Sequence, residues 1–183
     1  MKNKFIIWLA LTAMIVGCAK VPITGRRQLN MLPESTLMAM SVEQYAGFLA
    51  SNPVVRSGGE AKMISDIGNK MVQAVNQYLK KHGQMKRVEG FNWEFNLVDD
   101  PTVNAWCMPG GKVVFYSGIL PICRDENGIA VVMGHEIAHA VARHGNERMS
   151  QGLATQLGGV ALGVAMSDKP QETQQLFQLA YGI

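Results

Sequence analysis

The residues H-E-I-A-H at positions 135–139 form an H-E-x-x-H motif, and this motif constrains the fold more than any other feature of the chain. It lies in a long apolar run, residues 129–141, which predicts a buried helix. Side chains four residues apart share one face of a helix, so His135 and His139 can grip one metal ion. Glu136 lies on the same turn, where a metal-bound water would be. The motif predicts hydrolysis of peptide bonds with zinc; the alternative is a helix whose two histidines only form hydrogen bonds.

The N-terminal segment has the pattern of a targeting signal. Lys2 and Lys4 precede an apolar stretch over residues 5–16, which is too short for a comfortable membrane span. Small residues then lead to Cys18, as in bacterial lipoprotein signals, where the cysteine becomes the lipidated first residue. Ala19 in place of an aspartate indicates sorting to the outer membrane. We therefore expect a lipoprotein of the cell envelope that faces the periplasm; the alternative is an uncleaved anchor with an incidental cysteine.

The length allows one domain after this signal. We expect a signal peptide over residues 1–17, a lipidated tether over 18–32 and one domain over 33–183, which is enough for a sizeable core. The formal net charge of the whole chain is +3, and no basic stripe accompanies aromatic residues. This pattern argues against a nucleic-acid partner.

Periodicity predicts helices and two strands for the rest of the chain. Apolar spacing favours helices over residues 33–49, 60–81, 125–150 and 152–166, the last one closely packed or surface-associated. Strict alternation over 91–98 and strand-forming residues over 112–117 favour two strands. The intervening residues 104–111 contain Pro-Gly-Gly and are predicted to be a loop with a tight turn.

Two cysteines lie between the first of these strands and the motif helix. In an oxidising compartment Cys107 and Cys123 could form a disulfide worth roughly 3 kcal/mol on the loop-entropy model. The alternative is two buried free thiols, and the sequence does not decide between them because it does not give the distance.

Several motifs together resemble the HtpX/Oma-like zinc metallopeptidases, which are related to the CAAX prenyl proteases, and in particular their LoiP-like members, periplasmic lipoproteins of the outer membrane. The likeness is carried by the lipoprotein signal, V-P-I-T-G-R-R at 21–27, Asn104-Ala105 before Pro109-Gly110-Gly111, S-G-I-L at 117–120, and H-E-I-A-H followed by Arg143-His144 and Glu147.

The resemblance implies an α+β zincin-like fold of the gluzincin type, mostly helical with a small antiparallel or mixed sheet. It implies one zinc ion with His135 and His139 as ligands and Glu136 as the general base. It also implies an edge strand that aligns an extended substrate. Our candidate for that strand is formed by Val113, Val114, Phe115 and Tyr116.

The third zinc ligand of that family is a glutamate in a Glu-x-x-x-Asp pattern, and no such pattern follows His139. Glu172 is the only glutamate after Glu147, so it is the one later candidate for the third ligand. Its support is low, because the residue four positions further on, Leu176, is not acidic. His144 would point away from the ligand face of a continuous helix, which predicts a structural or supporting role. The sequence ends inside a helical pattern at Ile183, so we expect a chain that is incomplete at its C-terminus.

The sequence therefore predicts a zinc endopeptidase of the bacterial envelope that cleaves misfolded or unassembled proteins. Its expected partners are extended or unfolded polypeptides and a membrane reached through the N-terminal lipid, with homo-oligomer formation left open. A second hypothesis is a catalytically incompetent lipoprotein that binds peptides or partner proteins. A third is a protein that holds zinc with His135 and His139 only when another chain supplies a ligand.

Overall fold

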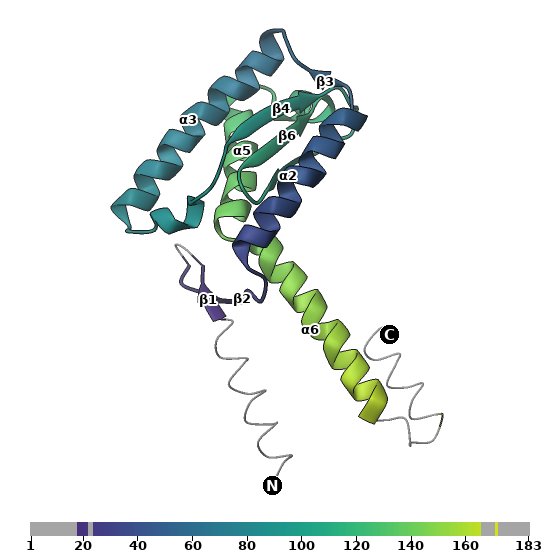
Figure 1. The fold of residues 1–183 in the computed structure, drawn as a ribbon. Coiled ribbons are helices and arrows are strands. Elements are labelled where there is room, and N and C mark those ends of the chain that lie inside the picture. Colours follow the sequence, from purple (N-terminus) through teal and green to yellow (C-terminus); the bar gives the residue numbers. More distant parts are fainter. Residues whose placement is uncertain (1–17, 22–23, 166–170, 172–183) are drawn as a thin grey trace. The chain divides into compact units, whose positions relative to one another are not determined.

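The computed structural model describes residues 18–21, 24–165 and 171 of the 183-residue chain (Figure 1). The predicted signal peptide and Glu172 lie outside these ranges. The chain divides into two compact units, and the larger one comprises Lys20–Arg27 and Leu32–Gly145. Two short strands near the start, β1 (Cys18–Lys20) and β2 (Arg27–Leu29), form a two-stranded sheet.

The larger unit contains a four-stranded mixed sheet with the order β3-β4-β6-β5. Its strands are β3 (Val54–Val55), β4 (Glu94–Val98), β6 (Lys112–Tyr116) and β5 (Ala105–Met108). Strand β4 pairs in parallel with β6, whereas β3 and β5 run antiparallel to their neighbours. Strand β6 therefore lies inside the sheet, and β5 forms one edge.

Helices cover both faces of this sheet. The first face packs against α3 (Gly59–Lys81) and α5 (Glu126–Val141), and the second packs against α2 (Glu34–Ser51) (Figure 1). Strand β6 alternates between the two cores: Val113 and Phe115 face α3 and α5, and Val114 faces the α2 side. Burial on both faces explains why this strand is a continuous apolar run.

Short helical segments join these elements. They are η1 (Met85–Val88), η2 (Ser117–Ile119) and α4 (Leu120–Cys123). After α5 the chain continues as α6 (His144–Ala165), most of which belongs to the smaller unit. None of the helices in the described ranges combines the length and the apolar character that crossing a bilayer requires.

In the smaller unit one buried serine links two segments that are distant in the sequence. The Ser150 hydroxyl donates to Asn146 Oδ1 at 3.0 Å and accepts a hydrogen bond from the backbone N–H of Met31 at 2.8 Å. Both Ser150 and Asn146 are buried. A hydroxyl that donates and accepts in this way has its hydrogen-bonding capacity used inside the unit.

The predicted α+β composition, the two helices before the sheet and the strands around 94–98 and 112–116 are confirmed. The predicted loop over 104–111 was wrong, because its first residues form β5. Strand β5 pairs with β6 across a tight turn in which Gly110 and Gly111 have φ of 85° and 83°. Only glycine adopts this conformation readily, and a Cβ at Gly111 would lie 2.7 Å from the Trp93 ring.

Candidate metal centre

Helix α5 carries the H-E-x-x-H motif, and its start is fixed by a capping aspartate. Asp125 Oδ1 accepts a hydrogen bond from the backbone N–H of Gly128 at 2.9 Å. Such a cap satisfies a donor that the first turn of a helix would otherwise leave unpaired. Gly128 also permits close contact with α4, since a Cβ there would lie 1.9 Å from the carbonyl oxygen of Cys123. The beginning of α5 is therefore held firmly against the end of α4.

The two histidines of the motif converge as their spacing predicts. The Nε2 atoms of His135 and His139 are 3.0 Å apart, and the ring centroids are 4.5 Å apart. Two imidazole ligands on one tetrahedral zinc, with Zn–N distances of about 2.0–2.1 Å, would have nitrogens about 3.3 Å apart. His135 is exposed and His139 is half-buried. The pair fits two ligand positions of one zinc ion.

Glu136 lies on the side of α5 that faces β5. Burial, with a smaller contribution from the negative charge of Glu136, raises the pKa of the Cys107 thiol on β5 to about 12. Cys107 Sγ lies 3.6 Å from the carbonyl oxygen of Met108, as a weak thiol donor would. At this pKa the thiol is protonated at neutral pH when no metal ion is bound. The half-buried Glu136 thus lies close enough to the edge strand for its charge to act on Cys107.

The edge strand beside this site is β5, and the prediction that Val113, Val114, Phe115 and Tyr116 form the edge was wrong. These residues belong to β6, which has a hydrogen-bonded strand on each side. Strand order depends on pairing between distant residues, which the sequence pattern does not encode. The backbone N–H of Tyr116 donates to the carbonyl of Asn104 at 3.1 Å. Because antiparallel pairing alternates, the backbone groups of Ala105 and Cys107 point away from β6.

The motif helix ends earlier than predicted. Helix α5 stops at Val141, and Arg143 adopts a left-handed conformation with φ of 61° before α6 begins at His144. The expected continuous helix over 125–150 was therefore wrong. Arg143 Nε lies 3.1 Å from Glu34 Oε2 on α2, and this ion pair holds the residue in its unusual conformation.

The bend also changes the place of His144. Its Nδ1 lies 2.7 Å from Nδ1 of His139, with the two ring centroids 4.8 Å apart. On an unbroken helix the side chain would have pointed away from the motif face. The predicted supporting role agrees with this contact, although the route by which His144 reaches His139 could not be read from the sequence.

The described residues do not complete the ligand set. Within residues 18–21, 24–165 and 171, no group of three His, Cys, Asp or Glu side chains is arranged to hold a metal ion. Glu172, the predicted third ligand, lies outside the described residues. The structure therefore supplies two imidazoles and the neighbouring Glu136, and the prediction for Glu172 stays a prediction.

Cys107 and Cys123 are both free thiols, so the disulfide alternative was wrong. Cys107 lies on β5 facing α5, and Cys123 lies at the end of α4, where it is buried in the core beneath the same helix. Each thiol packs as a small apolar side chain, which is common for free cysteines.

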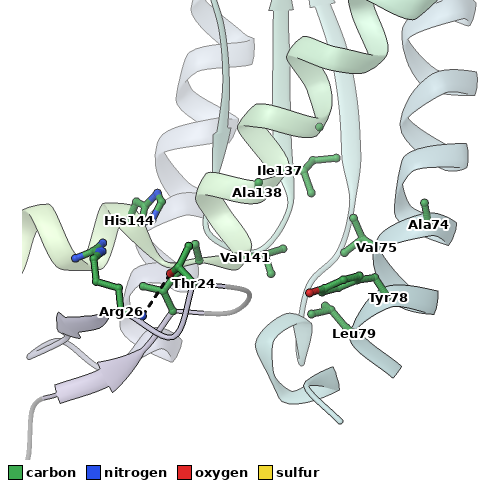
Figure 2. A pocket seen from close by; sticks show the side chains of 13 residues that line it. Thr24, Arg26, Ala74, Val75, Tyr78, Leu79, Ile137, Ala138, Val141 and His144 are labelled. Carbon is green, nitrogen blue, oxygen red and sulfur yellow. Dashed lines mark hydrogen bonds between the residues drawn. The ribbon is translucent and has the colours of Figure 1, made fainter. Parts of the chain in front are cut away.

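A pocket of about 730 Å³ lies beside α5 in the larger unit (Figure 2). Helix α3 forms one wall and α5 the other, and a segment of the tether closes one side. Its wall is mostly apolar, and His144 lines it too, so this imidazole lies between the pocket and His139. The lining residues are Val21, Thr24, Arg26, Ala74, Val75, Tyr78, Leu79, Gly134, Ile137, Ala138, Val141, Ala142 and His144.

Comparison with known proteins supports a metallopeptidase relationship. The chain is 32% identical over 137 residues to the mitochondrial metalloendopeptidase OMA1 of Schizosaccharomyces pombe, covering 71% of this chain and 36% of that protein. It is 42% identical over 101 residues to the mitochondrial metalloendopeptidase OMA1 of Saccharomyces cerevisiae, covering 54% and 29%. It is 29% identical over 163 residues to the metalloprotease YcaL of Escherichia coli, covering 84% and 60%. The chain thus spans only part of each of these relatives.

The model of peptidase family M48 matches residues 62–181, which is more than half of the chain and includes α3, the sheet strands β4 to β6 and the motif helix. The predicted resemblance to HtpX/Oma-like metallopeptidases agrees with this match. The match also includes the H-E-x-x-H motif, whose two histidines converge. The chain therefore belongs to peptidase family M48.

Proposed function

We propose that this chain carries the active site of a zinc metalloendopeptidase of the gluzincin type. The observation that carries the proposal is the 3.0 Å separation of the His135 and His139 Nε2 atoms, with Glu136 between them in the sequence. The metalloendopeptidase names of the relatives support the same chemistry. The third ligand would come from residues outside the described ranges, with Glu172 as the predicted candidate, or from another chain.

The residues of the site would divide the chemistry as follows. His135 and His139 would hold the ion through Nε2. Zinc, when bound, polarises a carbonyl group and lowers the pKa of a coordinated water toward about 7. Glu136 would accept a proton from the attacking water and later deliver it to the leaving amine. This role is supported by the half-buried position of Glu136 and by the effect of its charge on Cys107 of β5.

The substrate would bind as an additional strand on β5. The outward backbone groups of Ala105 and Cys107 can pair with an extended peptide, whereas β6 is already paired on both sides. An unfolded or locally unfolded polypeptide can offer such a strand. We therefore propose misfolded or unassembled proteins as the substrate class.

We further propose that the protein acts in the bacterial envelope, anchored to the outer membrane and facing the periplasm. The support is the N-terminal sequence, with its two lysines, apolar stretch and Cys18. Lipid on Cys18 would anchor the enzyme through the tether and leave the peptidase domain in the periplasm. Labelling cells with a radioactive fatty acid, with Cys18→Ser as the control, tests this anchor.

A second candidate function is peptide binding without hydrolysis. It is favoured by one observation: in the described part of the chain only two side chains, those of His135 and His139, converge as metal ligands. The edge strand would still bind an extended peptide in that case.

The deciding experiment compares the full chain with Glu136→Gln after loading with zinc. An unfolded protein such as β-casein serves as the substrate, and cleavage is followed by gel electrophoresis. Glu126→Gln is the matched control, because Glu126 is an exposed glutamate in the first turn of the same helix. Loss of cleavage in Glu136→Gln alone supports the endopeptidase. Equal cleavage by the parent and Glu136→Gln would refute it, and casein binding without cleavage by either would favour the second function.

A further inference from the structure

The structure shows a contact at each ring nitrogen of His139. Its Nε2 lies 3.0 Å from Nε2 of His135, and its Nδ1 lies 2.7 Å from Nδ1 of His144. Both separations are hydrogen-bond distances. A ring nitrogen can donate only when it carries a proton. The position of the proton on one of the three rings therefore constrains its position on the other two.

Two arrangements of protons satisfy both contacts in neutral rings. In the first, His139 donates from Nδ1 to His144 and leaves the lone pair of Nε2 directed at His135. In the second, His144 donates to His139, which then carries its proton on Nε2. A metal ion needs the Nε2 lone pair of His139, so only the first arrangement leaves this ligand ready.

We propose that His144 is a positioning residue that accepts the Nδ1 proton of His139 and thereby keeps His139 Nε2 free for the metal. This inference rests on the zinc site proposed above. Metal-bound histidines commonly donate their other ring N–H to a fixed acceptor, which sets the tautomer and the ring orientation. His144 is not itself a ligand of the same ion, because it contacts the ring edge opposite Nε2.

The bend between α5 and α6 presents His144 to His139. The left-handed Arg143 turns the chain, and its ion pair with Glu34 at 3.1 Å anchors the turn to α2. The backbone N–H of Arg143 donates to the carbonyl of Ala140 at 3.0 Å, which closes the end of α5. A non-glycine residue adopts this conformation only where its surroundings hold it, so the bend is a built feature of the fold.

The surroundings of His144 also limit its freedom. The imidazole is half-buried, and its remaining surface lines the mostly apolar pocket beside Val141 and Thr24 (Figure 2). The contact with His139 Nδ1 and the partial burial of the ring together restrict its orientation.

The first test reads the tautomer directly in the full-length chain without metal. Long-range proton–nitrogen NMR spectra of chain labelled with ¹⁵N at histidine distinguish Nδ1–H from Nε2–H rings, at a pH of about 8.5 where histidine is neutral. We expect the Nδ1–H form for His139 in the parent and a shift toward Nε2–H in His144→Leu. In His144→Asn the amide oxygen can take the acceptor's place, so the Nδ1–H form should return. An unchanged His139 in His144→Leu would overturn the proposal.

The second test measures zinc affinity by competition with a coloured chelator. His144→Leu should weaken binding by about 10- to 100-fold, the usual effect of removing such a partner, and His144→Asn should recover most of it. His82→Leu is the matched control, because it removes an exposed imidazole at the end of α3. Equal losses of zinc affinity in His144→Leu and His144→Asn would mean that the imidazole contributes by packing and not by accepting the Nδ1 proton of His139. That result would overturn the proposal.

The two tests separate this inference from the proposed function. If the parent chain binds no zinc but its His139 tautomer depends on residue 144 as expected, the zinc peptidase is refuted and the positioning role stands. If zinc binds tightly and His144→Leu binds it equally well, the site stands and the positioning role fails.

Discussion

The ion pair between buried Lys112 and partly exposed Glu94 should respond unequally to the removal of its two charges. Lys112 Nζ donates to Glu94 Oε1 and to the carbonyl oxygen of Asn92 at 2.7 Å. The Lys112 side chain is only 4% exposed, whereas that of Glu94 is 42% exposed. The ammonium group has therefore left water almost completely, and the carboxylate has not.

The exposures set the expected magnitudes. In Lys112→Met the Glu94 carboxylate returns to water and the new side chain fills the apolar space, so the main loss is the bond to Asn92, about 1 kcal/mol. In Glu94→Gln the Lys112 ammonium stays buried without its anion. Leaving a buried charge unpaired costs about 3–5 kcal/mol, and the remaining bond to Asn92 places this case near the lower end, at about 3 kcal/mol. Glu94→Gln should thus lower the free energy of unfolding by about 2 kcal/mol more than Lys112→Met does.

Urea unfolding at neutral pH, followed by tryptophan fluorescence, measures both changes. Lys62→Met and Asp66→Asn provide the matched control, because that pair is also a lysine and an acid but lies on the surface of α3, with side chains 75% and 49% exposed. Each control substitution should change the free energy of unfolding by less than about 0.5 kcal/mol. If Lys112→Met destabilised the protein more than Glu94→Gln, the argument from unequal exposure would be wrong.

Two further predictions concern the surroundings of the motif helix. Gly128→Ala should destabilise the protein by at least about 1–3 kcal/mol, because the new Cβ would lie 1.9 Å from the Cys123 carbonyl oxygen. Gly145→Ala is the control and should change thermal stability little, because its Cβ would meet no atom within 4 Å. Similar melting temperatures for the two variants would contradict this prediction. Cys107, with its pKa raised from 9.0 to about 12, should hold roughly a thousandfold less thiolate at neutral pH than in the unfolded chain, and it should react with iodoacetamide correspondingly more slowly. Because the folded state resists losing this proton, the contribution of Cys107 to stability should fall as the pH rises from about 9 toward 12. Equal alkylation rates in the folded and the urea-unfolded chain, measured by mass spectrometry, would refute the shift.

Local patterns in the sequence were sufficient for several elements. The helices α2 and α3 and the strand β6 follow from apolar periodicity and from runs of strand-forming residues, which depend only on neighbours along the chain. The pairing of His135 with His139 belongs to the same class, because a four-residue spacing on any helix brings two side chains together. The motif therefore predicted the two candidate ligands and Glu136 before any tertiary contact was known.

The tertiary structure decided which strand lies at the edge of the sheet and where the motif helix ends. Strand order follows from pairing between distant segments, and that placed β5, not β6, beside the site. Ala140, Ala142 and Arg143 are good helix formers, and no proline interrupts the pattern, so the sequence favoured a continuous helix. At the bend Arg143 is instead paired with Glu34, which comes from another helix far away in the sequence. The contact between His144 and His139 depends on that bend, because an unbroken helix would carry a side chain five residues further on to a different face.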